Sequence, residues 1–199
     1  MKRAFDFIMS LLGIILLSPV ILVLVVLVKL TSKGPILFKQ KRIGKDNKEF
    51  YIYKFRTMRV DTPNVATHLL ENPDMYITRV GKLLRKTSLD ELPQIINIIK
   101  GEMSIVGPRP ALWNQYDLIE ERDKYGANDI LPGLTGWAQI NGRDELPIPI
   151  KAKLDGEYVK RCSFGFDLKW FFMTFIKVLK RDGVVEGKAQ SKTAKQTNQ

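Results

Sequence analysis

The stretch AFDFIMSLLGIILLSPVILVLVVLV, residues 4–28, decides the architecture of this 199-residue chain. Its only charged residue is Asp6, and a straight helix of this length reaches roughly 38 Å, enough to cross a bilayer. Pro19 must kink or break such a helix, because proline has no N–H and its ring clashes with the carbonyl of Ile15. Inside lipid that carbonyl needs another partner, and the Ser18 hydroxyl is the nearest candidate.

Basic residues flank this run on both sides. Lys2 and Arg3 precede it, and five basic residues follow between Lys29 and Arg42. Positive residues favour the cytoplasmic side of a membrane, so both flanks favour the same side. A helix over residues 1–30 that enters the membrane, breaks at Ser18-Pro19 and returns satisfies both flanks. We therefore predict a re-entrant helix, with a spanning helix and a cleaved signal peptide as the alternatives.

The charge balance points to an anionic partner. The formal net charge is +11, and ten basic residues lie between Lys29 and Arg59, directly after the apolar run. This position suits attraction to anionic membrane lipids. No nucleic-acid-binding motif is visible, so we expect no nucleic acid partner. The single Cys162 excludes an internal disulfide, and the single His68 excludes a multi-histidine metal site.

The rest of the chain predicts an α+β domain that is mainly helical, over residues 31–185. Short apolar runs at 36–38 and 50–55 predict two strands joined by a hairpin loop at 44–48. Helices are expected at about 77–85 and 89–100, the second ending at Gly101. We expect loops in the glycine- and proline-rich segments 103–110 and 131–143.

The C-terminal region predicts one more helix and a tail. Residues 164–181 combine aromatic and basic side chains at helical spacing, which suits an amphipathic helix lying in a membrane interface. A core helix with a solvated basic edge is the alternative. The polar tail 186–199 is expected to be disordered.

An acidic pair stands at the predicted start of the helix at 89–100. Ser88 and Glu91 have the spacing of a capping box, and Pro93 is tolerated near a helix start. Asp90 and Glu91 therefore fall in the first turn, where two carboxylates about 100° apart can flank one spot. The alternative is that they only stabilise the helix start, as acidic residues often do there.

Two further segments offer groups for an anion. Pro108 and Pro110 stiffen the segment around Arg109, whose planar guanidinium suits phosphate oxygens. A glycine-rich turn segment, residues 132–143, ends in Arg143. Together with the acidic pair and the membrane segment, these features indicate chemistry on a phosphorylated substrate.

These segments closely resemble the bacterial sugar transferase family, the small monotopic phosphoglycosyl transferases that start lipid-linked glycan assembly. The resemblance covers roughly residues 1–185, with the motifs in family order. The matching stretches are Ser18-Pro19, KFRTM (54–58), SLDELP (88–93), KGEMSIVGPRP (100–110), PGLTGWAQINGR (132–143) and FDLK (166–169).

The resemblance implies a reaction and its residues. A sugar phosphate moves from a nucleoside diphosphate sugar, expected to be a UDP-sugar, to polyprenyl (undecaprenyl) phosphate. Asp90 would be the nucleophile that forms a covalent phosphosugar intermediate, which fits because an ionised carboxylate needs no base. Asp90 and Glu91 would hold Mg²⁺. The expected substrate-binding residues are Lys54, Arg85, Pro108, Arg109, Pro110, Arg143 and Asp155.

Two other readings stay open. The acceptor could attack directly in a ternary complex, with Asp90 and Glu91 holding only metal, or the chain could be a non-catalytic membrane adaptor. The resemblance implies the cytoplasmic face of the bacterial inner membrane, and self-association as a homo-oligomer is left open. Loop 144–150 does not match the family and is expected to bear on the choice of sugar.

Overall fold

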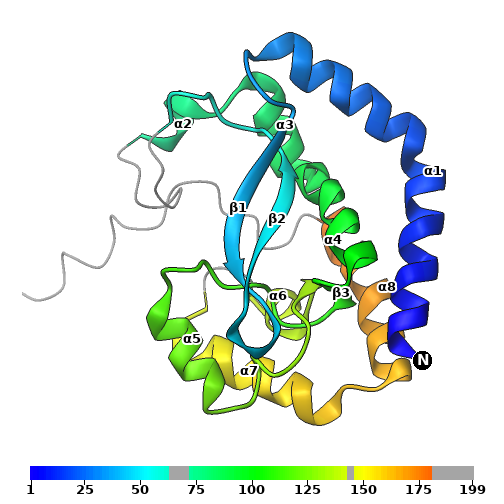
Figure 1. Ribbon diagram of the computed structural model, residues 1–199, viewed down its shortest axis with the longest axis vertical. Coiled ribbons are helices and arrows are strands. Elements are labelled where there is room, and N and C mark those ends of the chain that lie inside the picture. The colour runs from blue at the N-terminus through cyan, green and yellow to red at the C-terminus, as the bar shows by residue number, and fades with distance from the viewer. Residues whose placement is uncertain (63–71, 143–145, 181–199) are drawn as a thin grey trace, which may run out of the picture.

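The computed structural model describes residues 1–62, 72–142 and 146–180. A long bent helix follows one side of the molecule, and a β-hairpin runs through the middle (Figure 1). Shorter helices lie on both sides of the hairpin (Figure 1). The predicted tail at 186–199 lies outside the described residues, as do His68, Arg143 and Arg181.

The apolar run forms helix α1 (Lys2–Thr31), which stays helical through Pro19. It bends near its middle (Figure 1), so the structure has the kink expected at Pro19 and not the break at Ser18-Pro19. The Ser18 hydroxyl donates to the Ile15 carbonyl at 2.7 Å, which confirms the predicted partner. Only 11% of the most apolar 18-residue stretch of α1 is buried, so most of this stretch is exposed, unlike a helix enclosed in a core.

The predicted hairpin is confirmed. Strands β1 (Leu37–Ile43) and β2 (Glu49–Phe55) pair antiparallel in a register that runs from Leu37↔Phe55 to Ile43↔Glu49. A short 3₁₀ turn, η1 (Lys45–Asn47), closes the loop. Asp46 and Asn47 take positive φ values of 55° and 56°, which these residue types tolerate in turns.

Helices lead from the hairpin to the acidic pair. They are α2 (Pro73–Tyr76), α3 (Arg79–Thr87), the 3₁₀ helix η3 (Leu89–Gln94) and α4 (Ile95–Lys100). The expected helix at 77–85 is α3, shifted by two residues. The expected helix at 89–100 is η3 followed by α4, and Gly101 ends it with φ 88°, as predicted.

The expected capping box at Ser88 is wrong. Ser88 is the left-handed C-cap of α3, with φ 56° and ψ 15°, and its side chain makes no cap bond to η3. Glu91 likewise does not reach back to Ser88 but points its carboxylate at two cations. Ser88 therefore ends α3, and the sharp turn at this residue sets the direction of η3.

The two segments expected to be loops contain a small parallel sheet. Strand β3 (Ser104–Val106) pairs with β4 (Gly133–Thr135), in the register Ser104↔Gly133 and Val106↔Thr135. The chains approach so closely that a Cβ on Gly133 would lie 2.1 Å from the backbone nitrogen of Gly107. Glycine is required here by contact with backbone.

The remaining helices are α5 (Tyr116–Asp123), α6 (Trp137–Ile140), α7 (Ile148–Arg161) and α8 (Phe164–Lys180). Helix α5 packs against α7, and α6 contacts both α7 and α8. α8 is the predicted amphipathic helix. Its Phe166, Trp170 and Phe171 pack on the core, while Phe164 and Phe172 are exposed.

Two apolar clusters hold these elements together. One gathers Ile52, Ile98, Met103 and Tyr158 around β2, α4 and α7. The other buries Leu24 and Val28 of α1 against β2 and α3. One side of the second half of α1 therefore packs against the domain, while the rest of this helix stays exposed.

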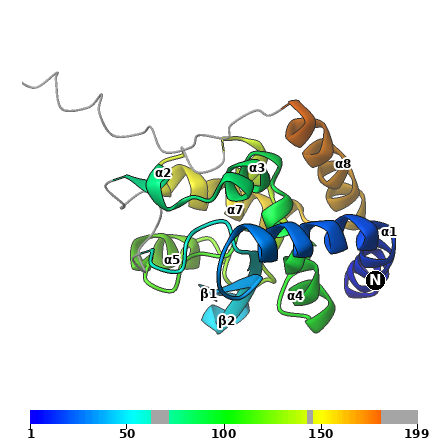
Figure 2. The same cartoon turned by 90° about the horizontal axis from the view of Figure 1, so that it is seen from above.

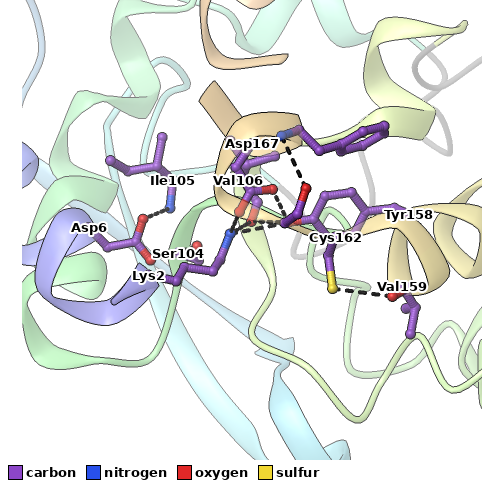
Figure 3. A network of polar contacts seen from close by, with 11 residues as sticks. Lys2, Asp6, Ser104, Ile105, Val106, Tyr158, Val159, Cys162 and Asp167 are labelled. Carbon is purple, nitrogen blue, oxygen red and sulfur yellow. Dashed lines mark hydrogen bonds and ion pairs between the residues drawn. The ribbon is translucent and has the colours of Figure 1, made fainter. Parts of the chain in front are cut away.

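The start of α1 is docked by polar contacts (Figure 3). Asp6 is 2% exposed, and its carboxylate accepts from the Ser104 hydroxyl at 2.7 Å. The Lys2 ammonium pairs with Asp167 of α8, which also accepts from the Tyr158 hydroxyl at 2.7 Å. The one charge inside the apolar run is thus a buried link to β3.

Candidate active site

The acidic pair lies on η3, the 3₁₀ helix that leads out of the turn at Ser88. Asp90 is 8% exposed, and the Glu91 side chain is 18% exposed. In a 3₁₀ helix neighbouring side chains point about 120° apart, so the two carboxylates face different surroundings. They differ accordingly in their partners.

Glu91 is enclosed by two cations that lie far from it in sequence. Its Oε1 accepts from the Lys54 ammonium at 2.7 Å and from Arg109 Nη2 at 2.6 Å. Arg109 Nη1 donates to Oε2 at 3.2 Å, so the guanidinium contacts both oxygens. Lys54 comes from β2 and Arg109 from the loop after β3. The structure therefore brings together the acidic pair and two of the predicted phosphate-binding residues.

The pKa values of the two carboxyl groups move in opposite directions. Burial raises the pKa of Asp90, and the Glu91 charge adds to this, against the pull of Lys54, Arg85 and Arg109. Burial would also raise the pKa of Glu91, but the charges and hydrogen bonds of Arg109 and Lys54 outweigh it and hold that pKa well below its usual range. Glu91 is a fixed anion, whereas Asp90 is a desolvated and more basic carboxylate.

The end of β2 connects the site to the membrane helix. Lys54 contacts Glu91, and Phe55 packs into the cluster that buries the second half of α1. Arg56 is 6% exposed and donates to the Ser32 carbonyl at 2.7 Å, where α1 ends. Thr57 accepts from Arg85 Nε at 2.9 Å, which fixes that predicted site residue beside η3.

Two other arginines hydrogen-bond to the backbone of the loop that carries Arg109. Arg42 of β1 donates to the Pro110 carbonyl at 3.0 Å, and Arg122 of α5 donates to the Arg109 carbonyl at 2.8 Å. Arg122 also donates to Asp155 Oδ2 from Nε at 2.8 Å and from Nη2 at 2.6 Å. Pro108 and Pro110 flank the arginine within this supported segment.

Asp155 therefore takes a different place from the one we expected. It is 1% exposed and paired with Arg122, so the structure favours a supporting role behind the Arg109 loop over a direct substrate contact. Sequence reasoning missed Arg122 altogether. No spacing or local motif sets this arginine apart, because its partners come from α7 and from the loop after β3.

The acidic pair suits Mg²⁺ in donor type. Mg²⁺ is usually bound by one or two carboxylates together with substrate phosphates. Asp90 and Glu91 supply two adjacent carboxylates, and no group of three or more His, Cys, Asp or Glu gathers anywhere in the described ranges. The residues therefore fit a metal that the substrate helps to bind, and do not form an all-protein metal site.

A buried carboxylate beside fixed cations, at the flank of an exposed apolar helix, defines a membrane-associated protein suited to phosphate chemistry. The family model of the bacterial sugar transferases matches residues 1–181, and the chain belongs to this family. The resemblance predicted from the motifs is confirmed.

Several relatives match nearly the whole chain. The uncharacterized sugar transferase EpsL of Bacillus subtilis is 41% identical over 92% of this chain and 90% of its own length. The UDP-glucose:undecaprenyl-phosphate glucose-1-phosphate transferase of Escherichia coli is 43% identical over 89% of this chain. An Aeromonas hydrophila UDP-N-acetylgalactosamine-undecaprenyl-phosphate N-acetylgalactosaminephosphotransferase is 39% identical. The match covers only 40% and 43% of these last two proteins.

Proposed function

We propose that this chain transfers a sugar 1-phosphate from a UDP-sugar to polyprenyl phosphate at a membrane surface, releasing UMP. The observation that carries the proposal is the contrast between Asp90, buried and basic, and Glu91, held as an anion by Lys54 and Arg109. The names of the Escherichia coli and Aeromonas hydrophila relatives support the substrate classes.

The proposed chemistry has two displacements at one phosphorus atom. An Asp90 oxygen bonds to the sugar-bearing phosphorus of the UDP-sugar, and the bond from that phosphorus to the oxygen of UMP breaks. A phosphate oxygen of the acceptor then bonds to the same phosphorus, and its bond to Asp90 breaks. Both nucleophiles are already anions, so neither step needs a general base. This explains how the described site can act without histidine.

The surrounding residues position and neutralise phosphate charge. The guanidinium of Arg109 and the ammonium of Lys54 lie within hydrogen-bond reach of Glu91, and Arg85 lies beside η3. Asp90 and Glu91 would hold Mg²⁺, which supplies charge neutralisation to the phosphates when it is bound. We keep Arg143 as a proposed nucleotide contact.

We further propose that α1 is re-entrant, so that the domain lies on the cytoplasmic face of the bacterial inner membrane. Its bend at Pro19, its basic flanks and its docking at both ends on one domain support this topology. A straight spanning helix would place its two docked ends on opposite sides of the bilayer. Anionic lipids would then contact the basic residues that follow α1.

A UMP-release assay tests the proposal. The chain in nanodiscs would be incubated with Mg²⁺, polyprenyl phosphate and a panel of UDP-sugars that includes UDP-glucose and UDP-N-acetylgalactosamine. We expect UMP release that depends on the acceptor and is strongest for one sugar. No release with any sugar would favour the membrane adaptor over the enzyme.

A further inference from the structure

An apolar cavity of about 320 Å³ lies between α1, the hairpin and η3, and we call it the α1–η3 cavity. All of its lining residues are apolar, which rules out a sugar or a nucleotide as its occupant. Its volume is that of a small-molecule site. Six of the lining residues matter for the argument: Ile14, Ile21, Val25, Leu37, Phe55 and Pro93.

The bend in α1 shapes this cavity. Ile14 precedes Pro19, whereas Ile21 and Val25 follow it, so the two halves of the bent helix both contribute to the wall. The neighbouring Leu22 is 65% exposed and points away from the domain. Only α1 therefore separates the cavity from the surface that contacts lipid in the proposed topology.

The cavity also lies next to the reactive carboxylate. Pro93 lines it and stands three residues after Asp90 in the same 3₁₀ helix. Side chains three residues apart in such a helix eclipse one another, with a rise of about 6 Å. An occupant of the cavity thus ends within one helical turn of Asp90.

Positive charge lies beside Asp90, on the other face of β2 from the cavity. Phe55 lines the cavity from one face of the strand, whereas Lys54 leaves the opposite face and donates to Glu91, which also pairs with Arg109. An amphiphile with an anionic head and an apolar chain would place its head near these cations and its chain in the cavity.

We infer that the α1–η3 cavity binds the isoprenoid units nearest the phosphate of the acceptor lipid. This inference rests on the proposed function and adds to it a subsite for the acceptor chain. The cavity would hold the phosphate end of the acceptor in line with Asp90, so it would contribute to acceptor KM and not to recognition of the UDP-sugar.

The test fills the cavity from α1. Ile21→Trp places a large ring in it, and Leu22→Trp places the same ring on the lipid-facing side as the matched control. For Ile21→Trp we expect KM for polyprenyl phosphate to rise about tenfold or more, with a much smaller change in KM for the UDP-sugar. Leu22→Trp should leave both values close to wild type. Equal acceptor KM in the two variants would overturn the inference.

A labelling experiment keeps the inference separate from the proposed function. A polyprenyl phosphate with a diazirine on its first isoprenoid units should label cavity residues in the full chain in nanodiscs. Excess unlabelled polyprenyl phosphate should suppress labelling, and phosphatidic acid, with a similar head and straight chains, should not. Equal suppression by both would mean that the cavity holds ordinary bilayer lipid. This result can be obtained even if the chain releases no UMP.

Discussion

Asp90 and Glu91 are adjacent in sequence but have opposite electrostatic surroundings. Burial raises the pKa of Asp90, whereas Arg109 and Lys54 overcome burial at Glu91 and lower its pKa. Glu91 thus orders the cations around Asp90 and stays charged at any physiological pH. The desolvated Asp90 is left as the carboxylate with the greater tendency to bond to an electrophile.

This difference predicts opposite effects of two isosteric changes on stability. The native state holds the Asp90 proton to higher pH than the unfolded chain, so the free energy of unfolding falls as pH rises through that window. Asp90→Asn should therefore raise the Tm at pH 7 above that of wild type. The gain should shrink as pH falls through the ordinary Asp pKa of about 3.9, because below it wild-type Asp90 is protonated in both states.

Glu91→Gln should do the reverse. The lowered pKa of Glu91 contributes stability above the ordinary carboxyl value, and this stability is lost as pH falls through that value toward the lowered one. The variant leaves Lys54 and Arg109 without their anion, at a cost of about 1–3 kcal/mol. Melting of both variants at one scan rate in detergent checks the order Asp90→Asn, wild type, Glu91→Gln at pH 7. A Tm for Asp90→Asn below that of wild type would contradict it.

The guanidinium of Arg109 should not be replaceable by an ammonium. It contacts both oxygens of Glu91, and lysine can offer only a point charge to these oxygens or to a phosphate. Arg109→Lys should lower kcat/KM by about tenfold or more. The control is Arg79→Lys, on the exposed side of α3. Equal kinetics for Arg109→Lys and wild type would mean that Arg109 only shapes its loop.

At the scale of elements, α1 is the part whose disposition most needs a direct test. We expect both of its ends to face the cytoplasm. In a Cys162→Ala background, a cysteine placed before Met1 and one at Gln40→Cys should react with the same membrane-impermeant reagent from the same side. Labelling from opposite sides would establish a spanning helix. Adding Ser18→Leu and Pro19→Ala should straighten α1 and shift it toward spanning.

The support behind Arg109 can be tested through α5 and α7. Asp155→Asn leaves the Arg122 guanidinium, 3% exposed, without a counter-ion. Breaking a buried pair in this way costs roughly 3–5 kcal/mol, which should lower the Tm strongly. The double variant Arg122→Met/Asp155→Leu should recover much of the loss. If Asp155→Asn were as stable as wild type, the pair would not support the loop.

Local patterns predicted the elements whose signals are local. The alternation in the hairpin, the apolar spacing of α3 and the stop at Gly101 all act within a few residues. The small sheet was missed because three-residue strands rich in glycine look like loops, and their parallel pairing joins distant segments. Helix α7 was missed because Pro147 and Pro149 resemble a loop, although proline is tolerated in a first helical turn.

At the scale of the whole molecule, the site is built where both ends of the membrane helix meet the domain. The start of α1 docks through Asp6 on β3, the strand that leads to Arg109. Its end docks through Arg56, two residues after Lys54. The view from above in Figure 2 shows α1 running across the domain, with α4 on one side of it and α8 on the other. Both docked ends of α1 therefore lie next to segments that carry a cation of Glu91.

The candidate site could be predicted only in part, because its residues come from distant segments of the chain. The motif residues Lys54, Asp90, Glu91 and Arg109 were found as separate signals, and the structure brings them into contact. No sequence pattern indicated that Glu91 would be enclosed by both cations while Asp90 stays desolvated. That distinction arises from tertiary burial, which neighbouring residues in a sequence do not reveal.

The central claim is that Asp90 bonds covalently to the sugar phosphate. An exchange assay tests it most directly: labelled UMP is incubated with the chain, a UDP-sugar and Mg²⁺ in the absence of polyprenyl phosphate. A double-displacement enzyme will move label into the UDP-sugar; Asp90→Asn will not, because an amide is a poor nucleophile, and Glu91→Gln will do so slowly, with partial recovery at high Mg²⁺. No exchange by wild type, or exchange that survives in Asp90→Asn, would contradict the assignment of Asp90 as the nucleophile.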